Sequence, residues 1–163
     1  MRNTTPETPG TQTLELKIPP PAVALLIAVA MWGLARFAPL LDMSAIVRVA
    51  AAATFALAGA GLDIAGIVSF RHARTTINPL SPEATSSLVC SGIYRVTRNP
   101  MYLGLLLILV AWAIFLSCAW AVSGPAAFVL YINRFQISPE ERLLAGKFGT
   151  EYAAYTARVR RWL

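Results

Sequence analysis

The most informative stretch for the fold is Arg98-Asn99-Pro100-Met101-Tyr102-Leu103-Gly104. There a basic loop is followed by an apolar segment that continues to Ile137. A fixed cation, an amide and a phenol therefore stand where water would give way to hydrocarbon. Polar and ionisable groups at a membrane boundary are typical of a functional site. The stretch predicts a membrane protein with polar chemistry at the membrane surface.

The composition excludes an ordinary soluble domain. Of the 163 residues, 56% are hydrophobic and 13% are charged, whereas soluble domains carry about 25% charged residues. Apolar runs cover residues 19–37, 45–70 and 101–137. A span needs about 20 residues, so the third run must fold back on itself. We predict an all-α polytopic membrane protein of about four transmembrane helices, built as a single membrane-embedded domain over residues 1–163.

The third apolar run needs a turn between its two helices. We predict that turn near Ser117 to Ala119, with a turn nearer Gly124 as the competing placement. The first placement puts Pro125 in the opening turns of the fourth helix, where a missing N–H does least damage.

Basic residues predict the orientation, because Lys and Arg near span ends stay on the cytoplasmic side. They cluster in the loop between the second and third spans and in the tail after the fourth, at Arg71, Arg74, Arg95, Arg98, Arg142, Lys147, Arg158, Arg160 and Arg161. We therefore expect a multi-pass protein with both termini and the active site facing the cytoplasm. Cys90 would lie on that side and Cys118 on the other, so a disulfide between them is excluded.

The net charge of +6 is explained by this topology and by attraction to anionic headgroups. We expect no nucleic-acid partner and no metal site. The first 17 residues, rich in Thr, Pro and Gly, predict a mobile tail.

Two features of the second span have different meanings. Ala52, Ala56 and Ala60 recur every fourth residue, a pattern that favours close helix packing. Asp63 is costly inside a membrane unless it faces the bundle or water. A structural hydrogen bond and a part in the site remain equal alternatives for Asp63.

The tail after Ser138 carries the signals of a new helix. Ser138, Pro139 and Glu141 form a predicted capping box with proline at the first helical position. Apolar residues then recur at helical spacing, at Leu144, Phe148, Tyr152, Tyr155, Val159 and Trp162. They predict an amphipathic helix that lies on the bilayer or against the bundle and is bent at Gly149.

The capping box leaves Glu140 without a structural role. If the last two spans form a hairpin, Glu140 comes near Arg98, Asn99 and Tyr102. These residues would offer a polar ligand a carboxylate, a cation and aromatic surface. The alternative is purely structural, with Arg98 at headgroups and Glu140 at a helix N-terminus.

The order and spacing of four blocks resemble the isoprenylcysteine carboxyl methyltransferase family, to which phospholipid methyltransferases are related. The blocks are residues 91–94, 98–104, 140–143 and 148–152, and the resemblance covers Thr75 to Val159. It implies a methyltransferase that uses S-adenosyl-L-methionine and binds it within residues 75–159. No glycine-rich dinucleotide motif is present. The cofactor-binding residues carried over by the resemblance, with Arg98 added from the same block, are Leu88, Val89, Tyr94, Arg98, Asn99, Pro100, Met101, Tyr102 and Glu140.

The chain departs from the family at Asn99, where histidine is frequent. An amide cannot carry a proton at neutral pH, so we expect no acid–base role for this residue. Glu140 and Arg134 are the candidate catalytic residues, Arg134 as a group that orients an anionic acceptor, with a snorkelling interfacial arginine as its alternative.

The expected function is methyl transfer to a lipophilic acceptor, for example a carboxylate such as that of a prenylcysteine. The alternatives are a phospholipid N-methyltransferase, a sterol-reductase-like NADPH enzyme and a non-catalytic membrane protein. The partners expected are membrane lipids and a lipid or lipophilic small-molecule substrate. The sequence leaves open the acceptor, its nucleophilic atom, the oligomeric state and the cellular membrane.

Overall fold

A computed structural model of the chain describes residues 15–39, 41–73 and 87–163. All regular structure in these residues is helical, which confirms the predicted all-α class. The elements in chain order are α1 (Pro20–Ala35), α2 (Ala45–His72), the 3₁₀ turn η2 (Gly92–Arg95), α3 (Pro100–Leu116), the 3₁₀ turn η3 (Ala119–Val122), α4 (Ser123–Ile132), the π-helical turn η4 (Asn133–Ile137) and α5 (Ser138–Thr156).

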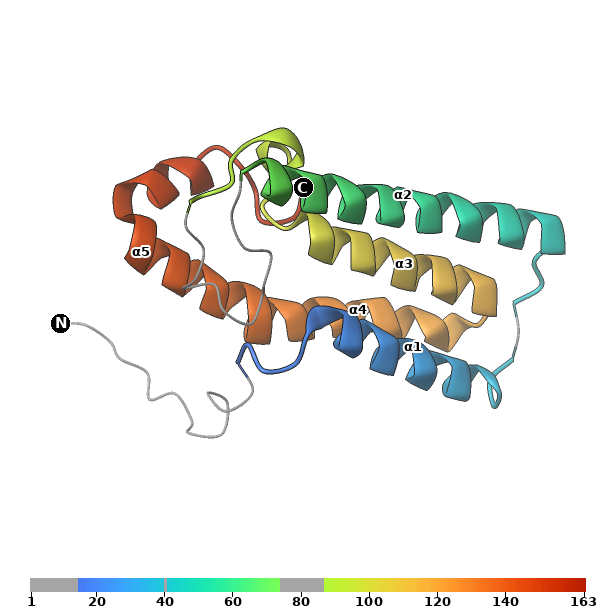
Figure 1. Ribbon diagram of the computed structural model, residues 1–163. Helices are drawn as coiled ribbons and strands as arrows, with labels where there is room; N and C mark the ends of the chain where they lie inside the picture. The colour runs from blue at the N-terminus through green and yellow to red at the C-terminus, as the bar shows by residue number, and fades with distance from the viewer. Residues whose placement is uncertain (1–14, 40, 74–86) are drawn as a thin grey trace.

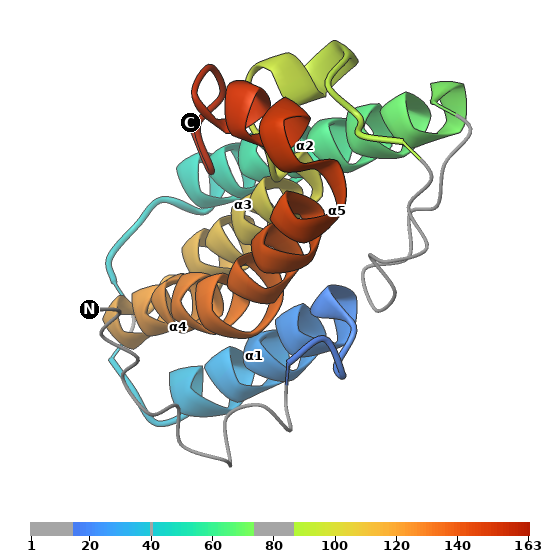
Figure 2. The same cartoon turned by 90° about the vertical axis from the view of Figure 1, so that its left-hand side faces the viewer.

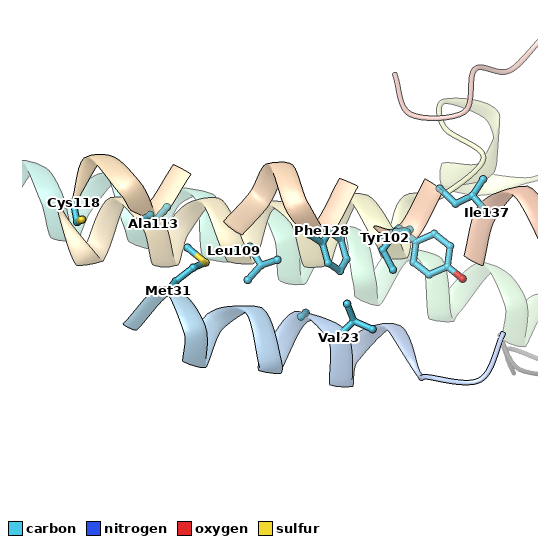
Figure 3. Packing of buried hydrophobic residues seen from close by; sticks show 11 residues of the cluster. Val23, Met31, Tyr102, Leu109, Ala113, Cys118, Phe128 and Ile137 are labelled. Atoms are coloured by element: carbon cyan, nitrogen blue, oxygen red, sulfur yellow. The ribbon is translucent and has the colours of Figure 1, made fainter. Parts of the chain in front are cut away.

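Helices α1 to α4 lie side by side as a bundle, and α5 projects from one end of it (Figure 1). Helix α3 is central, because it contacts α1, α2 and α4. The main core lies between α1, α3 and α4, where Met31, Leu109, Phe128 and Ile132 are almost fully buried (Figure 3). Close packing of these large apolar residues fixes the positions of the three helices relative to one another.

Helices α2 and α3 approach each other closely at two glycines. A Cβ atom added at Gly104 would stand 2.7 Å from the Gly59 carbonyl oxygen, and one added at Gly59 would stand 2.6 Å from the Gly104 carbonyl oxygen. Only glycine permits this approach of two backbones. Close helix packing is thus found at Gly59, next to Ala60 of the predicted stripe, whereas Ala52 and Ala56 of that stripe border a hollow.

The turn between α3 and α4 is where the first prediction placed it. Helix α3 ends at Leu116, and Ser117 adopts a left-handed conformation with φ of 50°. Its hydroxyl donates to the Leu41 carbonyl at 3.0 Å, which ties this turn to the linker between α1 and α2. The competing placement near Gly124 is wrong, because α4 begins at Ser123 and contains both Gly124 and Pro125.

Among the described helices, α2 is long and apolar enough to cross a membrane, with 28 residues. Helices α1 and α3 are apolar but shorter, with 16 and 17 residues. Length and composition thus support membrane association through α2. The number of spans is taken up below as a proposal.

The predicted mobile tail is wrong for residues 15–17, and residues 1–14 lie outside the described part of the chain. The Glu15 carboxylate pairs with Arg134 at 2.8 Å and with Arg142 at 2.7 Å. The Leu16 N–H donates to the Phe135 carbonyl at 3.1 Å. Pro139, four residues after Phe135, has no N–H to offer that carbonyl, so the N-terminal segment supplies the missing donor.

The predicted capping box at Ser138 is also wrong. Helix α4 does not end there but continues through the π turn η4 into α5, and Ser138 has helical dihedrals. Its hydroxyl donates to the Asn133 carbonyl at 2.7 Å instead of capping a new helix. Because a π turn accommodates Pro139 without ending the helix, no free N-terminus exists for Glu141 to cap.

The bend predicted at Gly149 is confirmed, with φ of 49° and ψ of −117° inside α5. Beyond this kink, Tyr152, Tyr155 and Val159 are buried together against Leu88 and Cys90. The amphipathic face therefore packs on the segment before α3. Trp162 does not belong to that face, since it packs against the main core.

Candidate active site

A cavity of about 500 Å³ lies where α5 leaves the bundle. Its walls come from α2, the segment before α3, the start of α3, α5 and the prolines that open α1. Seen from the α5 end, these segments gather at one end of the helices (Figure 2). The volume is within the usual range for small-molecule sites, about 300–1,000 Å³.

The structure brings most of the predicted cofactor residues to this one cavity. The predicted residues that line it are Leu88, Val89, Tyr94, Arg98, Asn99, Met101, Tyr102 and Glu140. Pro100 does not line it, because this buried residue forms the first turn of α3. Arg134 does not line it either, and its guanidinium is paired with Glu15. A direct contact of Arg134 with a ligand in this cavity is therefore not supported.

Glu140 and Tyr102 form a polar contact on the cavity wall. The Tyr102 hydroxyl donates to Glu140 Oε1 at 2.5 Å, across the junction of α3 and α5. Burial raises the pKa of the Glu140 carboxyl to about 7, and neighbouring Glu141 adds to the rise while the Tyr102 hydrogen bond opposes it. Removal from water disfavours the charged form of a carboxylate, and a cation beside it favours that form. Glu140 is thus placed to bind a positively charged group.

Arg98 also lines the cavity and belongs to an ionic network. Its Nη1 atom lies 3.1 Å from Glu141 Oε1, and Glu141 also pairs with Arg161 at 2.5 Å. Arg98 Nη1 further donates to the Tyr152 hydroxyl at 3.5 Å. Within the described residues, Arg98 Nε is buried without a hydrogen-bond partner. A buried donor without a partner is costly, so this N–H is available to a ligand oxygen.

The C-terminal tail closes over the same end of the bundle. The Asn99 amide donates from Nδ2 to the Arg161 carbonyl at 2.9 Å, and the Thr97 hydroxyl donates to that carbonyl at 3.3 Å. The Arg98 N–H donates to the Arg160 carbonyl at 3.0 Å. Asn99 therefore has a structural role, fastening the tail, in addition to its place on the cavity wall.

Aromatic rings form the wall on the side of the segment before α3. The Tyr155 hydroxyl donates to the Tyr94 carbonyl at 2.8 Å. The Phe70 and Tyr94 rings meet edge to face, with centroids 5.4 Å apart. Burial raises the pKa of the Tyr94 phenol above its ordinary value, so the ring stays neutral at physiological pH.

Several lining residues were not predicted as site residues. Tyr152, Tyr155 and Leu144 belong to the amphipathic face of α5, and their signal was read as contact with the bilayer or the bundle. Asp63 was left between two alternatives, and the structure places it on the cavity wall. The prolines Pro19, Pro20 and Pro21 carried no sequence signal for a site. Helix period alone does not distinguish a core face from a face that borders a cavity.

The arrangement can hold a zwitterionic ligand. Glu140 offers negative charge, Arg98 offers a free N–H of a cation, and apolar and aromatic walls separate them from water. Charge-assisted contacts of this kind gain strength where water is excluded.

Comparison with known proteins agrees with the resemblance found in the sequence. A family model described as "Phospholipid methyltransferase" matches residues 47–151. An uncharacterised protein of Haemophilus influenzae (strain ATCC 51907 / DSM 11121 / KW20 / Rd) is 54% identical over 63 residues, which are 39% of this chain and all of that protein.

Proposed function

The chain belongs to the phospholipid methyltransferase family, and we propose that it transfers a methyl group from S-adenosylmethionine to a lipid amine at the membrane surface. The observation that carries the proposal is a single cavity lined both by Glu140, bonded to Tyr102, and by Arg98, whose Nε has no partner among the described residues.

The residues of the cavity fit this cofactor. The orphaned Arg98 Nε suits the carboxylate of the methionyl end, and Glu140 suits its ammonium. The buried rings of Tyr94 and Tyr155 suit the flat adenine. The cavity volume of about 500 Å³ is adequate for a ligand of this class.

The protein's contribution would be positioning in a dry site. S-adenosylmethionine, when bound, supplies a methyl group made electrophilic by its sulfonium. Tyr102 would hold the Glu140 carboxylate in one orientation, and Glu141 would hold Arg98. Val89 and Ile137, both buried, would exclude water from the reacting end. Holding two reactants in line converts a bimolecular encounter into an effectively unimolecular step.

The balance of charge supports an amine as the acceptor. The charged residues on the cavity wall, within the described part of the chain, are Asp63, Arg98, Glu140 and Glu141, three carboxylates against one guanidinium. An anionic acceptor such as a prenylcysteine carboxylate would meet this excess of negative charge. A lipid ammonium would be attracted by it. The description of the matching family supports the same choice.

A second hollow supports a hydrocarbon tail on that acceptor. It measures about 570 Å³ and lies between α1 and α2 over α3, and the described residues that line it are apolar, among them Ala24, Ala53, Ala56 and Trp112. It shares Pro21 and Leu105 with the cavity of Glu140. We propose that the lipid tail lies in this hollow while its headgroup enters the cavity.

We expect Ala53→Phe to narrow this hollow and to raise KM for a long-chain lipid amine about 5-fold, because about 1 kcal/mol of tail burial is lost. A short-chain analogue should be affected less. Ala58→Phe is the matched control, since Ala58 is exposed on the same helix and does not line the hollow. Equal changes in KM for both chain lengths would count against the hollow as the tail site.

We further propose four membrane spans, formed by α1, α2, α3 and α4 with η4. The outward faces of these helices are rich in exposed apolar side chains, as at Leu26, Ile46, Leu57 and Leu130. Such surface is unfavourable in water and favourable in lipid. Arg98, just before α3, and Arg160 of the basic tail are joined at the α5 end by a backbone hydrogen bond, and this end would be cytoplasmic.

This topology predicts opposite accessibility for two thiols, the native one of Cys90 and one introduced at the far end of the bundle. Cys118 is 2% exposed and would resist labelling from either side, so Val122→Cys, at a position 66% exposed, is used in a Cys118→Ala background. In sealed vesicles of cytoplasmic-side-out orientation, an impermeant maleimide should label Cys90 and should not label the thiol introduced by Val122→Cys. Burial raises the pKa of the Cys90 thiol, so labelling is run at mildly alkaline pH. Labelling of both thiols from one face would overturn the topology.

The function itself is tested with detergent-solubilised protein. S-adenosylhomocysteine should bind saturably, NADPH should not, and the methyl group of labelled S-adenosylmethionine should appear in phosphatidylethanolamine. Binding of NADPH alone would favour the reductase alternative. Methylation of a prenylcysteine in place of the lipid amine would keep the methyl donor and overturn the acceptor. If the protein binds neither cofactor, the proposed enzymatic function is wrong.

A further inference from the structure

Asp63 is an acidic side chain in α2. No role in helix packing or in the proposed cofactor contacts explains its presence. It borders the Glu140 cavity. Its Oδ1 atom is buried and has no hydrogen-bond partner among the described residues. The helix contact at Gly59 does not depend on it, since that contact is made by backbone atoms.

Packing fixes where the Asp63 carboxylate lies. A Cβ atom added at Gly104 would overlap Asp63 Oδ1. The carboxylate therefore rests over the bare backbone of α3, two residues along from Tyr102. The absence of a side chain at Gly104 provides the space for it.

We infer that Asp63 is the acceptor-side carboxylate of the site, which binds the lipid ammonium and takes its proton. The inference rests on the proposed function. Glu140 is bonded to Tyr102 and Glu141 is paired with Arg98 and Arg161. The remaining carboxylate on the cavity wall, among the described residues, is Asp63, and it lies on α2, whereas Glu140 and Glu141 lie on α5.

The position of Asp63 along α2 agrees with this role. Ala56, on the wall of the apolar hollow, precedes it by seven residues. Seven residues make almost two turns, so both side chains lie on one face of the helix, about 10 Å apart. A lipid whose tail lies along Ala56 would thus present its headgroup to Asp63. One face of α2 would therefore contact both the tail and the headgroup of the acceptor lipid.

The chemical step assigned to Asp63 is a proton transfer. One N–H bond of the lipid ammonium breaks, its electron pair stays on nitrogen as a lone pair, and the proton forms an O–H bond with the Asp63 carboxylate. The neutral amine is then a nucleophile, which the ammonium is not. A general base must lie within hydrogen-bond reach of the proton that it removes, and the Asp63 carboxylate, which lines the cavity, would lie within that reach of a headgroup bound there.

The test separates binding of the cofactor from binding of the acceptor. In Asp63→Asn, the dissociation constant of S-adenosylhomocysteine should change less than about 2-fold, whereas kcat/KM for phosphatidylethanolamine should fall at least about 100-fold, in the range of a lost general base. A choline-headgroup lipid, which carries positive charge but no transferable proton, should inhibit wild type and bind Asp63→Asn about 10-fold more weakly. This second measurement needs no turnover.

Asp42→Asn is the matched control, because Asp42 lies exposed in the linker between α1 and α2; it should change none of these values. Asp63→Ala provides a second variant should the amide disturb packing, and it should reproduce the loss of choline-lipid binding. Unchanged kcat/KM and unchanged choline-lipid binding in Asp63→Asn, with an active wild type, would overturn the role of Asp63 alone. A wild type that binds S-adenosylhomocysteine but methylates no lipid amine would overturn the acceptor class instead.

Discussion

Glu140→Gln is expected to weaken S-adenosylhomocysteine binding at least 10-fold. The substitution keeps the shape of the side chain and its contact with Tyr102, but it removes the charge that would pair with the ligand's ammonium. A charge-assisted hydrogen bond contributes about 1.5 to 3 kcal/mol, which corresponds to a factor of about 10 to 150 in the dissociation constant. Titration calorimetry on the solubilised protein measures the change.

The pH dependence of S-adenosylhomocysteine binding provides a second test of the role of Glu140. Burial raises the pKa of Glu140 to about 7, and the charged form of the carboxylate is the one that binds a cation. In wild type, affinity should therefore fall as the pH is lowered through about 7 and be restored above it. In Glu140→Gln, this dependence should be absent, because the amide does not titrate.

Glu151→Gln is the matched control, since Glu151 is exposed on α5 beyond the Gly149 kink. Glu141→Gln is not neutral, because Glu141 pairs with Arg98 and Arg161 and does not cap a helix. Its effect should include a lower melting temperature as the C-terminal tail loosens. Wild-type affinity in Glu140→Gln, or a loss equal to that of Glu151→Gln, would remove Glu140 from the cofactor site.

Asn99→Leu is expected to weaken S-adenosylhomocysteine binding about 10-fold and to lower the melting temperature by several degrees. Leucine cannot donate to the Arg161 carbonyl, which Asn99 Nδ2 now reaches at 2.9 Å. The Thr97 hydroxyl still donates to this carbonyl at 3.3 Å, so the cost is that of one net hydrogen bond, about 0.5 to 1.5 kcal/mol. The tail that closes the cavity would lose one of its fastenings, so affinity and stability should fall together.

Asn99→His provides the comparison, because imidazole retains a donor and an acceptor. Affinity should decrease in the order Asn, His, Leu. An Asn99-dependent titration of the rate should be absent in wild type, whereas the His variant can acquire one near neutral pH. If Asn99→Leu keeps both its affinity and its melting temperature, neither the tail contact nor a ligand contact of this side chain matters.

Local sequence signals predicted the helices well. The apolar runs give α1, α2 and α3 to within a few residues at most ends, and the small and polar residues after Leu116 predict the turn at Ser117. Glycine at position 149 predicts the bend in α5. These features depend on backbone propensity and on hydrophobic period, which neighbours in the chain determine.

The same signals failed where a distant segment supplies the partner. Ser138, Pro139 and Glu141 fit a capping box, yet the helix continues, because the Leu16 N–H satisfies the Phe135 carbonyl and a π turn accommodates the proline. Glu15 was assigned to a mobile tail, yet two arginines of η4 and α5 pair with it. A local pattern carries no information about a donor or a cation more than a hundred residues away.

The sequence by itself determined that this protein is helical and apolar, and it predicted a ligand site at the block from Arg98 to Tyr102 with Glu140. Only the tertiary structure decided how these residues meet: Tyr102 on Glu140, Arg98 on Glu141, and the Arg161 carbonyl on Asn99. It also shows that Asp63 lines the cavity, whereas Arg134 does not line it and pairs with Glu15. The physical reason is that composition and period fix which surfaces avoid water, whereas the partner of a polar group depends on which segments the packed core brings within hydrogen-bond distance.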